Sequence, residues 1–296
     1  MSVLPVERQQ TLAAPVKLSG IGLHTGVPVN LVLTPAPANT GIVFKRVDLE
    51  GFAIKARAQN VAHVSYATSL MSKGVLISTT EHLLSALCAL GVDNVYAELD
   101  NLEVPIMDGS ALPFAREIER VGLRRQRARR DFVQILRPIE IVDGAKQIAI
   151  YPSRRFRITY SIEFTHPLIG KQRVEFSLDP ESYVKEIAAA RTFGFFDEVE
   201  TLRKAGLVRG GSLENAVVLS RDAVMNPEGL RFADEFARHK VLDLVGDLAL
   251  LGHPVLGHLV AHRAGHAMHY ALVSRLLGEK AAWRLAASPE MRTTAA

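Results

Sequence analysis

Alternating apolar and polar residues predict β-strands in both halves of the chain. Between residues 156 and 164 every second residue is apolar and the intervening residues are polar or charged. This is the period of a half-buried strand in an antiparallel sheet. Val29, Leu31 and Leu33 follow the same two-residue spacing. Further strands are predicted at 41–47, 94–100, 174–178 and 258–263.

Four segments have the composition or the period of helices. Residues 81–90 are almost wholly apolar, and residues 234–251 place apolar side chains along one helical stripe. Two further helices are predicted near 111–122 and at 266–279. Meander-like strands mixed with helices predict an α+β fold rather than a doubly wound parallel sheet.

A run of arginines between residues 116 and 130 is the clearest change in composition along the chain. We interpret it as the solvated end of a helix that continues into an exposed linker; the alternative is a patch that binds phosphate or a membrane surface. The run predicts a boundary between an N-terminal domain at 1–127 and a C-terminal domain at 128–283. We expect residues 284–296 to form a frayed tail. The arginines are Arg116, Arg120, Arg124, Arg125, Arg127, Arg129 and Arg130.

Composition and charge narrow the class of protein. Hydrophobic residues make up 48% of the 296 residues and charged residues 22%, so the chain can bury a substantial core. The net charge of +4 is too small to demand a nucleic-acid partner, and it suits a protein that handles an anionic substrate or works beside an anionic membrane. The single cysteine, Cys88, excludes an intrachain disulfide framework and a cysteine-based zinc ribbon. The sequence shows neither a signal peptide nor a transmembrane run, so we expect a cytoplasmic protein.

The run STTEH at 78–82 opens the apolar helix and contains the first candidate site. One interpretation is a capping box, in which Ser78 caps the helix and Glu81 reaches back to it. The other is functional, because a carboxylate and an imidazole on a buried first turn can serve as a base and a metal ligand. The order Glu81-His82 does not match the His-Glu-x-x-His motif of zincin proteases.

His239, Asp243 and Asp247 are spaced four residues apart and therefore line one face of the predicted helix at 234–251. On an exposed face, His239 and Asp243 would be a weak ion pair. On a buried face, the carboxylates would have to be paired or to bind a metal. Since the flanking stripe is apolar, a metal site is a strong alternative to the surface pair.

Two other histidines lie next to glycines at predicted turns or helix starts. His266 opens the last helix, where the helix dipole tends to lower the pKa of an imidazole, and it could equally be a core or capping residue. His24 lies in SGIGLHTG at 19–26, whose glycines predict a turn or a bulge. That run does not match the nucleotide-binding fingerprint GxGxxG.

Six ordered runs, which extend over nearly the whole chain, resemble one enzyme family. The sequence is similar to the UDP-3-O-acyl-N-acetylglucosamine deacetylases, zinc enzymes that catalyse the committed step of lipid A biosynthesis. It departs from the family pattern in loops such as 69–74. The runs are SGIGLHTG (19–26), STTEHLLSAL (78–87), EVPIMDGSALPF (103–114), RTFGF (191–195), GLRFADEFARHKVLDLVGDL (229–248) and GH (265–266).

The resemblance implies a set of catalytic and metal-binding residues. Hydrolysis of the N-acetyl group would need a metal ion, a proton acceptor, a proton donor and a group that contacts the reacting carbonyl. Spacing does not settle whether Glu81 alone transfers protons or shares that role with His266. The implied zinc ligands are His82, His239 and Asp243. The implied catalytic residues are Glu81, His266, Asp247 and Thr192, with Asp247 supporting His266.

The resemblance also implies a fold, a substrate site and a cellular setting. We expect two similar α+β domains, each layering a sheet and helices, with the active site between them. An insert at about 193–217 in the second domain would form the groove for the acyl chain. We expect a monomer in the cytoplasm of a Gram-negative bacterium, with peripheral association at the inner membrane and no nucleic-acid partner. The implied contacts to the UDP-linked acylated glucosamine are Lys240, Phe193, Leu23 and His24.

Three other functions compete with this interpretation. Two histidines and a carboxylate also form the metal site of non-haem iron oxygenases, although those ligands usually lie on barrel strands. A different amidohydrolase, including one that works without zinc, is a second alternative. The third is a binding module for nucleic acid or membranes built on residues 116–130, and the absence of aromatic residues in that run argues against stacking on single strands.

Overall fold

A five-stranded sheet and two helices form most of the first half of the computed structural model, which describes residues 7–287. The strand order is β2–β3–β9–β4–β5, in which β4 and β9 are parallel and the other neighbours antiparallel. The strands are β2 (Val16–Ile21), β3 (Pro28–Pro35), β4 (Ile42–Arg46), β5 (Phe52–Lys55) and β9 (Val95–Leu99). The helices are α1 (Glu81–Leu90) and α2 (Leu112–Val121). A separate three-stranded sheet contains β6 (Val61–His63), β7 (Ser69–Ser72) and β8 (Val75–Ile77).

A seven-stranded mixed sheet and three helices form most of the second half. Its central strand, β18, pairs with β13 on one side and with β14 on the other, and its first residues also pair with β11. The strands are β11 (Asp131–Ile135), β12 (Ile139–Asp143), β13 (Lys146–Pro152), β14 (Phe156–Glu163), β15 (Lys171–Ser177), β18 (Val255–His262) and β19 (Trp283–Ala287). The helices are α3 (Pro180–Glu186), α5 (Glu235–Leu248) and α6 (His266–Gly278).

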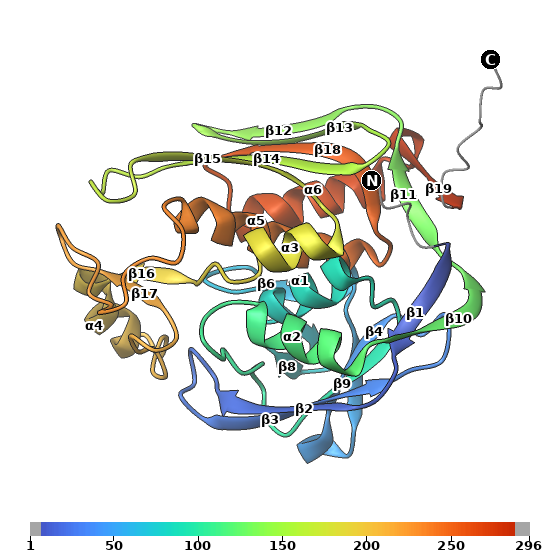
Figure 1. The fold of residues 1–296 in the computed structure, drawn as a ribbon, viewed down its shortest axis with the longest axis horizontal. Coiled ribbons are helices and arrows are strands. Elements are labelled where there is room, and N and C mark those ends of the chain that lie inside the picture. Colours follow the sequence, from blue (N-terminus) through green and yellow to red (C-terminus); the bar gives the residue numbers. More distant parts are fainter. Residues whose placement is uncertain (1–6, 288–296) are drawn as a thin grey trace.

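Two smaller units complete the described residues. A two-stranded antiparallel ribbon of β1 (Arg8–Leu12) and β10 (Leu123–Arg129) leads from the first half into the second. The other unit projects from the second half and contains β16 (Phe193–Phe195), α4 (Phe196–Lys204) and β17 (Val217–Leu219), with the two strands parallel (Figure 1). Short 3₁₀ turns are η1 (Val47–Leu49), η2 (Ala58–Asn60), η3 (Ala249–Leu251) and η4 (Lys280–Ala282).

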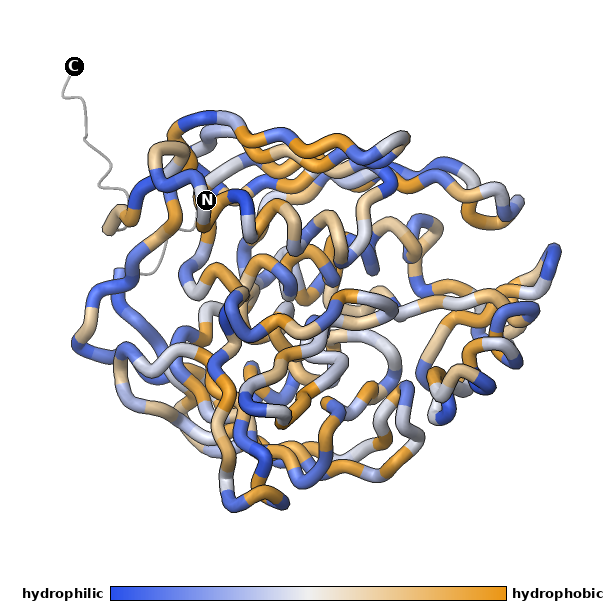
Figure 2. The backbone as a smooth tube through the Cα atoms, turned by 180° about the vertical axis from the view of Figure 1, so that it is seen from behind, coloured by the Kyte–Doolittle hydropathy of each residue, from blue (hydrophilic) through white to orange (hydrophobic). Residues whose placement is uncertain are grey.

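The two sheets enclose the helices, and α1 of the first half lies against α5 of the second (Figure 1). This arrangement follows from the pattern of apolar residues. Nine of the ten residues of α1 are buried, because both faces of that helix are covered. In the seven-stranded sheet, orange and blue positions alternate along the strands, as expected where one face covers the helices and the other meets solvent (Figure 2).

The structure confirms the predicted α+β class and the predicted positions of the main strands and helices. Residues 156–164 are a strand, as predicted, but the sheet is mixed, since β14 is antiparallel to β15 and parallel to β18. The division into domains at 127/128 stays a prediction. Among residues 7–287, no helix is both long and apolar enough to cross a bilayer.

Two predictions about irregular segments are wrong. The arginine run is not a linker, because α2 ends at Val121 and residues 123–129 form β10, which pairs with β1. Arginine side chains remain solvated on a two-stranded ribbon, so their charge did not reveal that the backbone is paired. The predicted frayed tail starts too early, since residues 284–287 belong to β19 and pair with β11. Residues 288–296 lie outside the described part of the chain.

Candidate metal centre

The first turn of α1 holds Glu81 and His82 at the centre of the molecule, where 3% and 4% of their surfaces are exposed. The predicted capping box is wrong, because the helix begins at Glu81 with Thr80 at the N-cap and without a side-chain cap. The hydroxyl of Ser78 instead bonds that of Ser69. The Glu81 carboxylate accepts a hydrogen bond from the backbone N–H of Thr68 at 3.0 Å. Both side chains are therefore held by the fold around the helix start.

Helix α5 presents His239 and Asp243 one turn apart and fully buried, which excludes the exposed ion pair considered from the sequence. Gly246 allows this helix to approach α1 closely. A Cβ atom at Gly246 would lie 2.1 Å from the backbone oxygen of Glu81, so only glycine fits at the crossing. The crossing thus brings the first turn of α1 onto the carboxylate-bearing face of α5.

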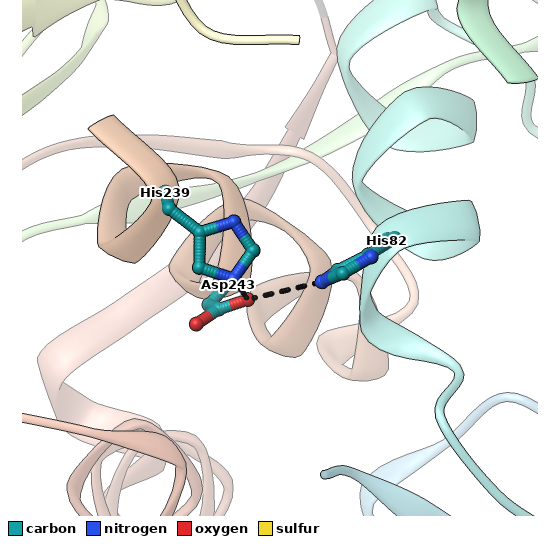
Figure 3. A group of neighbouring side chains, drawn as sticks. All are labelled: His82, His239 and Asp243. Atoms are coloured by element: carbon teal, nitrogen blue, oxygen red, sulfur yellow. Dashed lines mark ion pairs between the residues drawn. The ribbon is translucent and has the colours of Figure 1, made fainter. Parts of the chain in front are cut away.

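His82, His239 and Asp243 meet at this crossing, although they come from opposite halves of the chain (Figure 3). Oδ1 of Asp243 lies 3.6 Å from Nε2 of His82 and 3.3 Å from Nε2 of His239. The two imidazole rings are T-shaped, with centroids 5.0 Å apart. One candidate ligand atom from each residue lies within 4.8 Å of the others.

The donor set and its spacing fit a divalent metal ion. Ligand bonds of about 2 Å in a tetrahedral Zn²⁺ site place the ligand atoms about 3.3 Å apart. Oδ1 of Asp243 is buried and has no hydrogen-bond partner among residues 7–287, an arrangement that a bound cation would satisfy. Nδ1 of His239 donates to the backbone oxygen of Ala190 at 3.1 Å, which leaves Nε2 free to act as a ligand.

The electrostatics favour a neutral imidazole and a charged carboxylate at this position. Burial lowers the pKa of His239 to about 3, so the ring carries no proton on Nε2 at neutral pH. Burial by itself would raise the pKa of Asp243, but the neighbouring His239 and Lys240 bring that pKa well below its usual value. Nζ of Lys240 lies 2.8 Å from Oδ2 of Asp243 and is the nearest fixed positive charge.

A second group of polar side chains lies beside the first and contains His266 and Asp247. Nδ1 of His266 donates to Oδ2 of Asp247 at 2.7 Å, while Nε2 lies 3.8 Å from Oδ2 of Asp243. Burial lowers the pKa of His266, but the carboxylates of Asp247 and Asp243 outweigh burial and raise it to about 9. The expected lowering by the helix dipole is therefore wrong, because two carboxylates within 4 Å act more strongly than the dipole.

Glu81 also has a shifted proton affinity. Burial raises the pKa of its carboxyl, and the nearby His266 and His82 offset part of that rise. Carboxyl groups with raised pKa values can exchange protons near neutral pH. Burial therefore favours the neutral carboxyl of Glu81, whereas the neighbouring carboxylates favour the charged ring of His266. Both groups lie beside the candidate metal position.

The segment at 190–193 leads from α3 into the projecting unit and contacts α5. Ala190 supplies the carbonyl that binds His239, and Arg191 forms a fully buried ion pair with Glu235 at the start of α5, at 2.9 Å. The Phe193 ring lies 6.3 Å from that of His239, and Nζ of Lys240 lies 5.7 Å from the centroid of the Phe193 ring. Phe193, predicted from the sequence, therefore adjoins the metal candidate. Thr192, also predicted, precedes it, and its backbone oxygen accepts a hydrogen bond from the N–H of Val217.

Leu23 and His24 lie in a turn against the projecting unit rather than within the ligand group. Their backbone oxygens accept hydrogen bonds from Gly210 and Arg209. Glu103, buried in the EVPIMDGS run, accepts hydrogen bonds from the His24 backbone N–H and, at 2.8 Å, from the Thr79 hydroxyl. The turn is thus connected to the residues that precede Glu81.

Two residues of this site were missed in the sequence analysis. Thr68 donates to Oδ1 of Asp247 at 2.5 Å, and His269 donates to Oδ2 of the same carboxylate at 2.8 Å. His269 is three positions after His266 on one helix, and that spacing could have identified it. Thr68 lies far from α5 in the sequence, and no local pattern connects the two.

Comparison with known proteins agrees with this geometry. The family model for UDP-3-O-acyl N-acetylglycosamine deacetylase (LpxC) matches residues 9–278. The chain is 53% identical over 277 residues to the UDP-3-O-acyl-N-acetylglucosamine deacetylase of Solibacter usitatus, covering 94% of both chains. It is 48% identical to the deacetylase of Syntrophotalea carbinolica, covering 95% of this chain and 92% of that one. It is 46% identical to that of Myxococcus xanthus, covering 94% and 88%.

Proposed function

Because this chain belongs to the family of UDP-3-O-acyl N-acetylglycosamine deacetylases, we propose that it acts through a Zn²⁺ ion bound by His82, His239 and Asp243. The chain is a deacetylase of lipid A biosynthesis that releases acetate from UDP-3-O-acyl-N-acetylglucosamine. The convergence of three candidate ligand atoms at the crossing of α1 and α5 carries the proposal. When bound, Zn²⁺ would lower the pKa of a water molecule and polarise the acetamide carbonyl.

Glu81 is the group that takes up a proton during the attack on the acetamide. Its carboxylate is adjacent in sequence to the ligand His82, and the Thr68 N–H fixes its orientation. The raised pKa of this buried carboxyl brings its proton affinity closer to the working pH. We assign to the hydroxyl of Thr192 the role of donating to the oxygen on which negative charge develops.

His266 is the group that supplies a proton to the leaving amine. A pKa of about 9 keeps its ring charged at neutral pH, because Asp247 and Asp243 stabilise the imidazolium. Nδ1 is committed to Asp247, so Nε2 is the nitrogen that faces the site and can donate. An amine is a poor leaving group until it is protonated, and such a proton donor contributes roughly 10²–10⁴ in rate.

The substrate has an anionic part and an apolar part, and the chain offers a partner for each. Lys240 is the cation for the nucleotide diphosphate, and its Nζ would leave Asp243 as the substrate arrives. Phe193 lines the start of the acyl groove, which continues along the unit at 193–217 toward Leu23 and His24. Phe193 packs on Phe236 and Phe164, with ring centroids 4.9 and 5.8 Å apart, so its position is rigid.

We place the enzyme in the cytoplasm as a monomer that associates peripherally with the inner membrane. The substrate combines a water-soluble nucleotide with an acyl chain, so the enzyme works where the aqueous cytoplasm meets the membrane lipid. All the residues assigned to the reaction come from one chain, and none requires a second copy.

Metal reloading and two substitutions test the proposal. The protein is stripped with a chelator under nitrogen and reloaded with Zn²⁺ or Fe²⁺, and release of free amine from the UDP-linked substrate is measured. We expect Zn²⁺ at one ion per chain to restore turnover. Glu81→Gln should retain zinc and lose roughly 10²–10⁴ in kcat. His239→Ala should lose zinc, and a stoichiometry that stayed at one would show that the ligand set is wrong.

An exposed glutamate provides the matched control for this experiment. Glu140 lies on β12, the edge strand of the seven-stranded sheet, and accepts a hydrogen bond from the Tyr151 hydroxyl. It is not among the residues assigned to the reaction, so Glu140→Gln should leave both zinc and kcat unchanged. Deacetylation that survives complete removal of the metal would identify a zinc-independent amidohydrolase instead. Restoration by Fe²⁺ with consumption of oxygen would identify an iron oxygenase.

A further inference from the structure

A buried histidine and a buried tyrosine lie next to Asp247 and are not among the candidate metal ligands. His269 and Tyr160 are both fully enclosed, with 0% of their surfaces exposed. Nδ1 of His269 lies 2.8 Å from Oδ2 of Asp247, and Nε2 lies 2.9 Å from the Tyr160 hydroxyl. The two residues come from α6 and from β14 of the covering sheet, so the seven-stranded sheet reaches the site through this contact.

The directions of these hydrogen bonds follow from the chemistry of the groups. Asp247 is ionised, because His266 and the bonds it accepts outweigh burial and lower its pKa to about 2, so it can only accept. Nδ1 of His269 therefore donates to it. Burial lowers the pKa of His269, so the ring is neutral and its Nε2 can only accept. The single proton of the Tyr160 hydroxyl lies between two acceptors, Nε2 of His269 and the backbone oxygen of Ala264, each 2.9 Å from the hydroxyl oxygen.

Asp247 then receives three hydrogen bonds that leave it one orientation. His266 and His269 donate to the same oxygen, Oδ2, at 2.7 and 2.8 Å. Thr68 donates to Oδ1 at 2.5 Å. Rotation of the carboxylate would break at least two of these bonds in the buried interior, where an unpaired acceptor is costly.

We propose that His269, supported by Tyr160, is a positioning residue that holds Asp247 in the orientation needed to support the proton donor His266. This inference rests on the proposed function and extends it to a residue that does not touch the substrate. Without the His269 bond, Oδ2 could turn away from His266, and the imidazolium would lose part of the interaction that keeps it charged and aligned.

The polarity of this site distinguishes positioning from simple filling of the core. A packing residue on α6 needs only volume, and its neighbours Leu272, Val273 and Leu276 are apolar and equally buried. His269 instead has a polar partner for each ring nitrogen. Tyr160 also lies 2.9 Å from the backbone oxygen of Ala264, just before α6, so the tyrosine holds the entry to the helix that carries both histidines.

Two amide substitutions separate the two hydrogen bonds. The amide nitrogen of asparagine occupies the position of Nδ1, so His269→Asn can still donate to Asp247 but cannot reach Tyr160. The amide of glutamine extends to the position of Nε2, so His269→Gln can pair with Tyr160 but not donate to Asp247 in the same way. Both side chains are polar, and neither is much larger than histidine. Packing alone therefore does not predict that the glutamine variant is less active than the asparagine variant.

The measurements are kcat and KM for the UDP-linked substrate, zinc content and thermal unfolding of the zinc-loaded enzyme. We expect His269→Asn to retain kcat within about threefold, and His269→Gln to lose roughly 10–100-fold in kcat with KM and zinc content unchanged. His258→Asn is the matched control and should leave kcat unchanged, because within residues 7–287 that half-buried ring bonds the Thr159 hydroxyl alone.

The outcomes distinguish this inference from the function on which it rests. Equal kcat values for the Asn and Gln variants, or a loss that appears in KM or zinc content rather than in kcat, would overturn the positioning role while the parent enzyme stays active. A zinc-loaded parent chain that releases no amine would overturn the proposed function and this inference with it.

Discussion

Replacing Gly246 with alanine should separate catalysis from stability at the crossing of α1 and α5. The added Cβ would lie 2.1 Å from the backbone oxygen of Glu81, whereas ordinary van der Waals contact begins at 3.4 Å. The two helices would have to move apart by about 1.3 Å (3.4 minus 2.1). The obstructing atom belongs to the backbone, so rotation of a side chain cannot relieve the clash.

The displacement is expected to affect turnover more than folding. Misplacement of catalytic groups by about 1 Å can cost roughly 10²-fold in rate, and Gly246→Ala moves Glu81 and His82 relative to His239 and Asp243. Overpacking costs about 1–3 kcal/mol, and alanine recovers about 1 kcal/mol of helix propensity over glycine. We therefore expect roughly 10²-fold lower kcat with a net loss of stability of about 0–2 kcal/mol.

The assay compares kcat of zinc-loaded protein with the free energy of unfolding measured by denaturant titration. Gly278→Ala is the control, because a Cβ atom at Gly278, at the end of α6, would meet no neighbour within 4 Å. That variant should retain full turnover. A kcat of Gly246→Ala within about threefold of the parent would refute the argument that this crossing sets the catalytic geometry.

Two further predictions concern Lys240 and Cys88. Lys240→Ala should raise KM for the nucleotide-linked substrate roughly tenfold or more through loss of a charge-assisted contact, and an unchanged KM would contradict a phosphate role. Cys88 lines a cavity of about 170 Å³ at the far end of α1, and burial raises the pKa of its thiol to about 11. Compared with a thiol of pKa 9.0 in the unfolded chain, its thiolate fraction at pH 8 should be roughly a hundred times smaller. The rate of alkylation by iodoacetamide, followed by mass spectrometry, is compared between protein in buffer and protein in denaturant. Equal rates in the two conditions would contradict the prediction.

The predicted ligand set depended on two kinds of sequence information. The four-residue spacing of His239, Asp243 and Asp247 is a local property of a helix, and it correctly places these side chains on one face. Local spacing did not decide between a surface pair and a metal site, because burial depends on what covers the helix. The resemblance to a known family supplied His82 as the third ligand, and the structure brings it within 3.6 Å of Asp243.

Other features escaped sequence analysis because they depend on contacts between distant segments. Glu81 does not form the local capping box, because its buried carboxylate accepts a hydrogen bond from the backbone N–H of Thr68 instead. The arginine-rich segment pairs as β10 with a strand more than a hundred residues earlier, and side-chain charge does not report on backbone pairing. The raised pKa of His266 likewise depends on two carboxylates from α5 rather than on its own helix.

The sequence by itself determined where strands and helices form and which faces of them are apolar, because these depend on residues a few positions apart. It also determined which side chains could bind a metal or carry a proton. Only the tertiary structure decided that α1 and α5 cross at Gly246, and that His82 faces Asp243 while His269 supports Asp247. Those outcomes depend on which apolar faces cover each other, a property of the whole folded chain.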